Sequence, residues 1–270
     1  MNAWAVDLDG VVWRGRLTVP GAPEAVAQLR AANGRLAFVT NSAARSPAEV
    51  AEKLAGHGIA DAADLVVTSG MAAASMVPPG VRAYVIGSPG LRTELQARDI
   101  ELVGDRAPAD VVVIGISAEF DYGALTAAMR VVRAGARFIA TNDDATFPDA
   151  DGLLPGNGAI VAAVATATGV EPEIAGKPHQ PMAELVRAKL GSSGIVVGDR
   201  PETDGMFARS MGYRFGLVLS GVTSSKDLPV DPAPDVVADD LADLLAKVRQ
   251  TKVQQTKAQQ TKVQQTKVRQ

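Results

Sequence analysis

Short apolar runs typical of buried strands alternate with helical patterns along this chain, and no other feature restricts its possible folds as much. The predicted strands cover residues 4–6, 36–39, 65–68, 81–86, 111–116, 137–140, 195–197, 215–219 and 235–237. One helix is expected to begin at Ser46-Pro47-Ala48-Glu49, which combines an N-cap serine, a first-turn proline and a capping-box glutamate. Others are expected over residues 122–133 and 159–166. This alternation predicts an α/β protein with a doubly wound parallel sheet and helices on both faces.

Two carboxylates follow the first apolar run. Asp7 and Asp9 are two residues apart, so on an extended backbone their side chains point the same way, and Gly10 then permits a sharp turn. Two convergent carboxylates at a strand end suit a hard cation, with one of them left to attack or to move protons. Taken alone, the same residues also fit an ordinary Asp-Gly turn.

Further polar groups lie beyond predicted strands or in constrained turns. Thr40-Asn41-Ser42 follows the strand at 36–39 and offers hydroxyl, amide and backbone N–H groups for phosphate oxygens, or simply for capping the next helix. Lys177 lies in a Gly-Lys-Pro turn and could be a solvated surface lysine. Asp199 follows the strand at 195–197, while Asp204 fits either the same site or a helix N-cap. Together they predict a ligand site, because open α/β sheets bind ligands at the carboxyl ends of their strands.

Composition narrows the classes of partner. Of the 270 residues, 47% are hydrophobic, and there is no cysteine, which excludes disulfides and thiolate chemistry. Six of the 27 Lys/Arg residues and none of the 30 Asp/Glu residues lie in 249–270, which leaves residues 1–248 with a net charge of −9. Such an acidic body predicts no nucleic-acid binding. No run is apolar enough to span a membrane and no leader is apparent, so we expect a cytoplasmic protein.

A five-residue repeat occupies residues 251–270, with Thr251-Lys252-Val253-Gln254-Gln255 as its first copy. A period of five residues advances about 140° per repeat on a helix, so its apolar residues cannot form one stripe. We expect this tail to be a disordered or loosely helical polar appendage. A tether to nucleic acid or membrane is the alternative, although one lysine per repeat is a low charge density for it.

Several common motifs are absent. The segment around Gly176-Lys177 has the wrong glycine spacing for a P-loop, and Gly156-Asn157-Gly158 lacks the third glycine of a dinucleotide-binding fingerprint. There is no Gly-x-Ser-x-Gly elbow. The two histidines, His57 and His179, are too few for a histidine-rich dinuclear phosphatase and are expected at the surface.

The polar segments resemble, in order and form, the four-motif signature of haloacid dehalogenase superfamily phosphatases. The matching segments are Asp7-x-Asp9-Gly10, Thr40-Asn41, Gly176-Lys177-Pro178 and Gly198-Asp199-x4-Asp204. The long interval between the second and third motifs is similar to the branch with a large α/β cap, which includes NagD-type, p-nitrophenyl phosphate, phosphoglycolate and glycerol-phosphate phosphatases. The resemblance covers residues 4 to 247 and does not include the repeat tail.

The resemblance implies a discontinuous, Rossmann-like core domain at 1–80 and 172–250, with an α/β cap domain inserted at 81–171. It also implies that Asp7 attacks phosphorus, that Asp9 protonates the leaving oxygen and then activates water, and that the enzyme hydrolyses small phosphate monoesters. Mg²⁺ would be held by Asp7, the Asp9 backbone carbonyl and Asp199, with Asp204 at or near these ligands.

In the same resemblance, Thr40 and Asn41 bind phosphoryl oxygens and Lys177 offsets negative charge. The segment 142–155 is expected to be a cap loop in which Asp144, Thr146 and Phe147 select the leaving group. The partner would be a small phosphorylated metabolite, and the oligomeric state stays open, with a homodimer among the alternatives. A catalytically silent protein of the same fold and a dehalogenase are the alternative functions. A dehalogenase is disfavoured because it needs neither Mg²⁺ nor a proton for the leaving halide.

Overall fold

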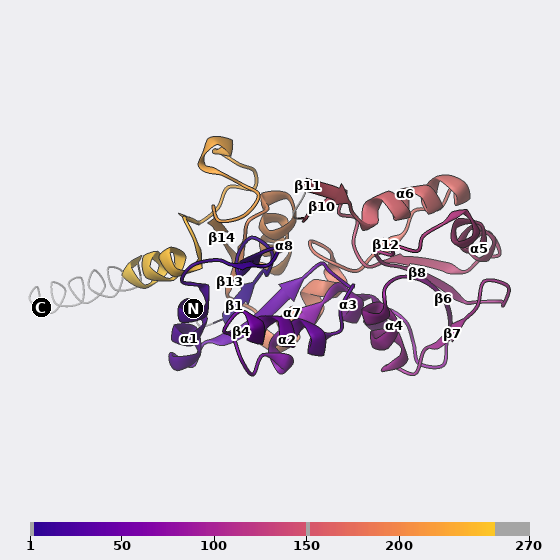
Figure 1. The fold of residues 1–270 in the computed structure, drawn as a ribbon, viewed down its shortest axis with the longest axis horizontal. Helices are drawn as coiled ribbons and strands as arrows, with labels where there is room; N and C mark the ends of the chain where they lie inside the picture. The colour runs from indigo at the N-terminus through magenta and orange to yellow at the C-terminus, as the bar shows by residue number, and fades with distance from the viewer. Residues whose placement is uncertain (1–2, 150–151, 252–270) are drawn as a thin grey trace, which may run out of the picture.

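The chain forms two α/β lobes that lie side by side (Figure 1). The structure, a computed structural model, describes residues 3–149 and 152–251. The first lobe contains both ends of the described chain, and the second is built from its middle (Figure 1).

A parallel six-stranded sheet forms the first lobe, in the order β15-β14-β13-β1-β4-β5. Its strands are β1 (Ala3–Val6), β4 (Arg35–Thr40), β5 (Val66–Thr68), β13 (Ile195–Gly198), β14 (Arg214–Val218) and β15 (Val236–Ala238). The central strands β1 and β13 are buried along their whole length, which explains why they are continuous apolar runs rather than alternating ones.

Helices cover both faces of this sheet, because successive strand residues point to opposite sides. Ala3 and Ala5 belong to an apolar cluster with α7 (Gln180–Leu190) and α8 (Met206–Met211). Trp4 and Val6 face the other way. They pack in a second cluster with residues of α1 (Ala22–Ala31), of α2 (Pro47–Gly56) and of a helix over residues 241–251. This is the doubly wound arrangement that the sequence predicts.

The second lobe contains a parallel five-stranded sheet in the order β12-β9-β8-β6-β7. Its strands are β6 (Arg82–Ile86), β7 (Glu101–Val103), β8 (Val111–Ile114), β9 (Arg137–Ala140) and β12 (Glu173–Ile174). One face packs against α5 (Tyr122–Arg133) and α6 (Asn157–Thr168), and the other packs against α4 (Pro89–Gln96). The middle of the chain therefore forms an inserted α/β unit.

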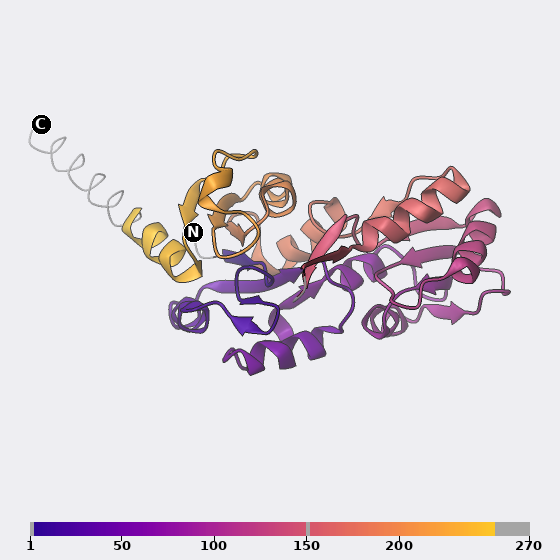
Figure 2. The ribbon, with the colours of Figure 1, turned by 45° about the horizontal axis from the view of Figure 1, so that its top comes forward.

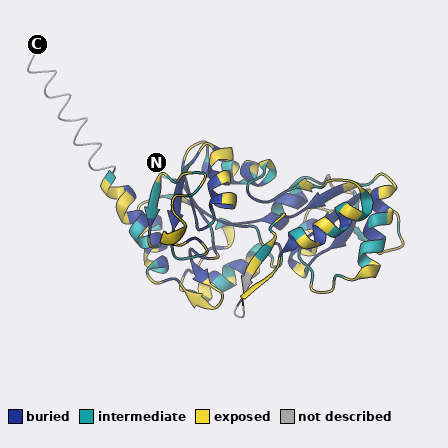
Figure 3. Cartoon of the chain, turned by 90° about the horizontal axis from the view of Figure 1, so that it is seen from above, coloured by how far each residue is buried: buried dark blue, intermediate teal, exposed yellow. Residues whose placement is uncertain are grey.

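An apolar core links the two lobes. The cluster that contains Ala5 and Val39 of the first sheet continues through Ala73 of α3 (Ser69–Ser75) to Leu91 of α4 and Val113 of β8. Buried segments accordingly run through both lobes and the junction between them (Figure 3). The lobes are therefore packed together along this side.

Two antiparallel hairpins and three short helical segments complete the described chain. The first hairpin, β2 (Trp13–Arg14) with β3 (Leu17–Thr18), follows β1. The second, β10 (Thr146–Asp149) with β11 (Gly152–Pro155), extends beside the junction of the lobes (Figure 2). The short segments are the 3₁₀ helices η1 (Ala63–Leu65) and η3 (Ser225–Asp227) and the π-helical turn η2 (Pro201–Gly205).

Most predicted elements are present, with small shifts. The capping box of α2 forms as expected: the Ser46 hydroxyl accepts from Glu49 N at 3.3 Å, and the Glu49 carboxylate accepts from Ser46 N at 2.7 Å. The expectation of a loop over 142–155 is wrong, because β10 and β11 pair there. Helix α6 begins at Asn157, two residues earlier than predicted.

The second sheet extends slightly past the predicted end of the insert. Strand β12 at Glu173–Ile174 pairs with β9, although these residues were assigned to the core segment that begins at 172. Within the described residues, no helix is both long and apolar enough to cross a membrane. The repeats after Thr251 lie outside the described residues, so the expectation for the tail stays untested.

Candidate active site

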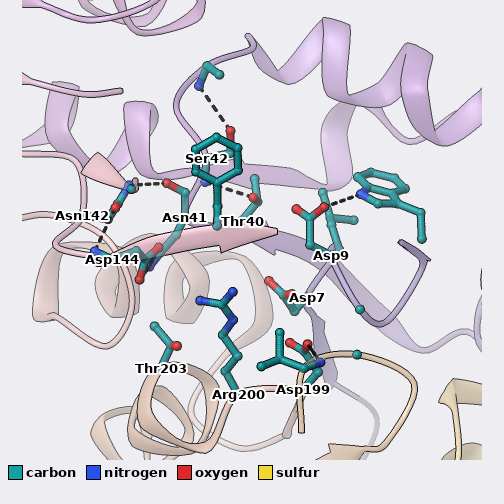
Figure 4. Close-up of a pocket in the computed structure, with 18 of the residues that line it drawn as sticks. Asp7, Asp9, Thr40, Asn41, Ser42, Asn142, Asp144, Asp199, Arg200 and Thr203 are labelled. Carbon is teal, nitrogen blue, oxygen red and sulfur yellow. Dashed lines mark hydrogen bonds between the residues drawn. The ribbon is translucent and has the colours of Figure 1, made fainter. Parts of the chain in front are cut away.

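A cavity of about 880 Å³ opens at the carboxyl ends of β1, β4 and β13 (Figure 4). Open α/β sheets bind ligands at this edge. Both lobes contribute to its lining. All the residues predicted for the site line this one cavity: Asp7, Asp9, Thr40, Asn41, Asp144, Thr146, Phe147, Lys177, Asp199 and Asp204.

A buried lysine lies at the base of the cavity. Lys177 Nζ is 2.5 Å from Asp7 Oδ1 and 2.7 Å from Asp204 Oδ1, and its side chain is only 4% exposed. Burial alone would lower the pKa of Lys177, but the carboxylates of Asp204 and Asp7 outweigh it and raise that pKa. The amine therefore stays protonated and is a fixed positive charge beside the carboxylate predicted to be the nucleophile.

Three carboxylates gather around this lysine. Asp7, Asp199 and Asp204 each offer an oxygen atom, and the three atoms lie within 4.8 Å of one another. Burial raises the pKa of Asp7 well above its usual value, against the opposing charge of Lys177. Burial and the charge of Asp204 raise the pKa of Asp199 to about 7. Hard oxygen donors crowded in this way, with more negative than positive charge, fit a divalent cation such as Mg²⁺.

Two glycines make room for Asp199. A Cβ added to Gly10 would lie 2.3 Å from Asp199 Oδ2, and one added to Gly221 would lie 1.9 Å from it. Gly10 also has φ +79°, which L side chains rarely adopt. The same oxygen accepts a hydrogen bond from Val222 N at 2.6 Å. The glycine of the first motif is therefore required by this packing as well as by the turn.

Asp9 lies in a different environment. Its residue is exposed, its carboxylate is not part of the three-carboxylate group, and its Oδ1 accepts a hydrogen bond from Trp13 Nε1 at 2.8 Å (Figure 4). The Trp13 ring stacks on His57 with the ring centroids 5.0 Å apart, and Lys53 Nζ lies 3.9 Å from the Trp13 centroid. One carboxylate oxygen of Asp9 is thus anchored to a buried ring, which leaves Oδ2 for a reacting group.

The Asn41 side chain joins three segments. Its Oδ1 accepts from Lys177 N at 2.7 Å, and its Nδ2 donates to Lys177 O at 3.1 Å and to Asp144 Oδ2 at 3.1 Å. The backbone oxygen of Asn41 accepts from Asn142 Nδ2 at 2.7 Å. Thr40 is buried, and its hydroxyl accepts from Ser42 N at 3.1 Å. Because the Asn41 amide is engaged within the protein, its contact with phosphate stays a prediction.

The second lobe closes one side of the cavity. Asp144 and Thr146 are partly buried, whereas Phe147 is 40% exposed. The backbone of Asp144 approaches the start of α6, where its oxygen accepts from Gly158 N at 2.9 Å. Burial raises the pKa of Asp144, with the hydrogen bond from Asn41 opposing the shift.

Sequence reasoning missed several residues that line the cavity. Trp13 was not singled out, although an aromatic residue four positions after Asp9 is a visible feature of the sequence. Arg200, which directly follows Asp199, donates to Thr146 O at 3.4 Å and so links the two lobes across the cavity. Asn142 was quoted only as part of the cap segment. His57 and His179, which were expected at the surface, are both partly exposed.

Comparison with known proteins agrees with the motif arrangement. Residues 4–101 match the family model described as haloacid dehalogenase-like hydrolase, and residues 174–244 match a HAD-hydrolase-like model. An acid sugar phosphatase from Staphylococcus saprophyticus is 36% identical over 86% of this chain and 92% of its own length. The chain belongs to the haloacid dehalogenase-like hydrolases. The resemblance noted in the sequence and the predicted fold are therefore confirmed.

Other relatives in this family have solved structures. The D-glycerol 3-phosphate phosphatase of Mycobacterium tuberculosis is 40% identical over 82% of this chain. The matched region spans 64% of the length of that protein. The glycerol phosphate phosphatase from M. tuberculosis has been solved in complex with magnesium and in complex with calcium. The magnesium complex has a TM-score of 0.83 and is 38% identical, over 90% of this chain and 76% of that one. A p-nitrophenyl phosphatase from Archaeoglobus fulgidus has a TM-score of 0.86 at 29% identity, over 91% of this chain and 98% of that one. The complex with magnesium supports Mg²⁺ as the cofactor of this chain.

Proposed function

We propose that this chain is a Mg²⁺-dependent phosphatase that hydrolyses small phosphate monoesters through an aspartyl-phosphate. The observation that carries this proposal is the Asp7 carboxylate, which follows β1 at the cavity base and pairs with the buried Lys177 at 2.5 Å. The named relatives act on glycerol phosphate, acid sugar phosphates and p-nitrophenyl phosphate, so we expect leaving groups of that size here.

The two carboxylates of the first motif divide the chemistry. Asp7 attacks phosphorus and forms an acyl phosphate while the bond from phosphorus to the ester oxygen breaks. Asp9 donates a proton to that departing oxygen from Oδ2, because Oδ1 is bonded to Trp13. Asp9 then accepts a proton from water, which attacks the phosphorus of the acyl phosphate. This second displacement releases inorganic phosphate and restores the Asp7 carboxylate.

Charge balance in the site depends on the remaining residues. Lys177 is held in place by Asp7 and Asp204 and offsets the negative charge that gathers as phosphate enters. Asp7, Asp199 and the Asp9 backbone carbonyl would hold Mg²⁺, with Asp204 beside them. When bound, Mg²⁺ would supply positive charge that stabilises the phosphoryl oxygens in the transition state.

Selection of the leaving group is assigned to the second lobe. Asp144, Thr146 and Phe147 line the cavity opposite the reacting carboxylates, and the cap as a whole excludes water while phosphoryl transfer occurs. Two alternatives compete with this proposal. A dehalogenase has no use for the proton that Asp9 delivers, and a silent binding protein has no use for a complete set of catalytic side chains.

Hydrolysis of p-nitrophenyl phosphate in Mg²⁺ tests the proposal. Asp7→Asn removes the attacking oxygen anion with little change of volume, so turnover should fall about a thousandfold or more. The protein should still fold, because Lys177 keeps its ion pair with Asp204. Asp105→Asn is the matched control, since Asp105 is exposed on the second lobe and does not line the cavity.

Excess chelator should abolish the activity, and acid quenching should trap phosphate on the wild-type chain but not on Asp7→Asn. Substantial turnover by Asp7→Asn would refute the assignment. Halide release from a haloacid would favour the dehalogenase, and wild-type protein inactive in both assays would favour the silent protein.

A further inference from the structure

A group of basic side chains lines the cavity on the side of the first lobe. The group consists of Arg14, Arg16, Arg45, Lys53 and Arg200. Across residues 3–149 and 152–251, none of these five forms an ion pair with a carboxylate, whereas Lys177 pairs with two. In a chain whose first 248 residues have a net charge of −9, five cations without a carboxylate partner at one cavity require an explanation.

We propose that Lys53 and Arg45 form a subsite for a second anionic group on the leaving group of the substrate. The inference rests on the proposed phosphatase function and specifies its substrate class. The preferred substrates would be phosphate monoesters that also carry a carboxylate or another phosphate. Both groups offer the same chemistry to the two cations, and the experiment below distinguishes them.

The position of Lys53 is the first argument. Lys53 lies in the last turn of α2, and its Nζ is 3.9 Å from the centroid of the Trp13 ring. The Nε1 of the same ring donates to Asp9 Oδ1 at 2.8 Å. The ammonium group is therefore one indole ring away from the carboxylate that protonates the departing oxygen, so the far end of a small leaving group comes within its reach.

The second argument concerns the environment of the lysine. Lys53 is partly buried, and this burial lowers the pKa of its amine, with the nearby charge of Arg45 lowering it further and Asp9 opposing. Arg45 is exposed, and its positive charge repels that of the partly buried Lys53. An anion placed between them would form charge-assisted hydrogen bonds with both.

The transferred phosphate does not occupy this place. Its proposed ligands, Thr40, Asn41 and Lys177, lie at the carboxyl end of β4 or just before α7, and Asn41 and Lys177 hydrogen-bond to each other there. A structural function for Lys53, in which it only covers the Trp13 ring, would be satisfied by its aliphatic stem or by any cation. A steering function would raise the association rate of every phosphate ester alike. The subsite differs from both because it predicts discrimination between substrates.

The test compares kcat/KM within two matched pairs of substrates. One pair is 3-phosphoglycerate and glycerol 3-phosphate, in which a carboxylate replaces a hydroxymethyl group. The other is glucose 1,6-bisphosphate and glucose 6-phosphate, which differ by a phosphate. Wild-type protein should prefer the more anionic member of at least one pair, and the pair that shows the preference identifies the anion.

Three variants then locate the preference. Lys53→Met keeps the stem over Trp13 but removes the charge, and it should reduce the preference about tenfold, the value of one charge-assisted hydrogen bond. Lys53→Arg should retain most of it, and Arg45→Gln should reduce it. Arg106→Gln, at an exposed arginine of the second lobe outside the cavity, is the control and should leave the ratio unchanged.

The outcomes separate this inference from the proposed function. If wild-type protein hydrolyses p-nitrophenyl phosphate but shows no preference in either pair, only the subsite is overturned. A preference that Lys53→Met and Arg45→Gln both leave intact also overturns it, as does an equal loss on every substrate, which would indicate steering. Absence of p-nitrophenyl phosphate hydrolysis would overturn the phosphatase itself. A preference that falls in Lys53→Met and returns in Lys53→Arg supports the subsite.

Discussion

Replacing Lys177 with methionine tests whether the buried lysine stabilises the fold as well as the reaction. The variant keeps the volume of the side chain but leaves Asp7 and Asp204 without their cation, and the Lys177 and Asp204 side chains are only 4% and 2% exposed. Breaking a buried ion pair by removing one partner costs about 3–5 kcal/mol. For a chain of this size, about 4 kcal/mol corresponds to a fall of about 12 °C in melting temperature.

Lys247→Met provides the comparison. Lys247 also lies 2.7 Å from a carboxylate, that of Asp243, but these side chains are 46% and 33% exposed. Such pairs contribute about 0–1 kcal/mol, so its melting temperature should fall by no more than about 3 °C. Both variants are measured by thermal unfolding in chelator.

Addition of Mg²⁺ should reduce the loss of melting temperature in Lys177→Met, because a divalent cation replaces part of the lost positive charge. Equal losses in the two variants would show that burial does not govern the energy of the Lys177 pair, and the reasoning would be wrong.

Two further predictions concern the reacting carboxylate and the metal. Trp13→Phe keeps an aromatic ring but removes the hydrogen bond to Asp9. Hydrolysis of an alkyl phosphate should therefore fall about tenfold more than hydrolysis of p-nitrophenyl phosphate, whose leaving group scarcely needs a proton. Equal losses on the two substrates would contradict the positioning of Asp9 by Trp13. Folding raises the pKa of Asp199 from 3.8 to about 7. Between these two pH values the folded metal-free protein retains a proton that the unfolded chain has lost, so the free energy of unfolding should fall as pH rises through this range. Calorimetric Mg²⁺ affinity should rise over the same range, as the proton no longer competes, and an affinity independent of pH between 5.5 and 7.5 would count against Asp199 as a ligand.

Most of the fold could be predicted from the sequence because the central strands are buried on both faces. The runs at 4–6 and 195–197 are uninterrupted apolar segments, and they coincide with β1 and β13. The missed strands are at the edges. Strand β7 is a three-residue edge strand with no fully buried residue, and β12 has two residues, so neither has an apolar pattern long enough to recognise. Strand β11 is exposed along its whole length, which removes the alternation that a half-buried strand would show.

The part of the candidate site that depends on the order and direction of the parallel strands could be predicted from the sequence. The part that depends on contacts between the lobes could not. Asp7 and Asp199 follow adjacent parallel strands, so their proximity is a consequence of the topology alone. The hydrogen bond between Asn41 and Asp144 joins residues 103 positions apart, and no local pattern encodes it. The pairing of Trp13 with Asp9 depends on the irregular turn between β1 and β2, where neither helical nor strand spacing applies.

The hydrogen bonds of Asn41 bear on how the two lobes share the reaction. Both backbone polar groups of Lys177 bond to the Asn41 side chain, whose amide nitrogen also holds Asp144. In the proposed reaction, a leaving group that displaces Asp144 would therefore act on the segment that carries Lys177. Thr146 and Phe147 lack such a link among the described contacts, apart from the bond of Thr146 O with Arg200. The proposed selection by the second lobe and the proposed chemistry in the first should therefore be separable at Phe147 but coupled at Asp144, because one partly buried Asn41 side chain bonds at once to Asp144 and to both backbone polar groups of Lys177.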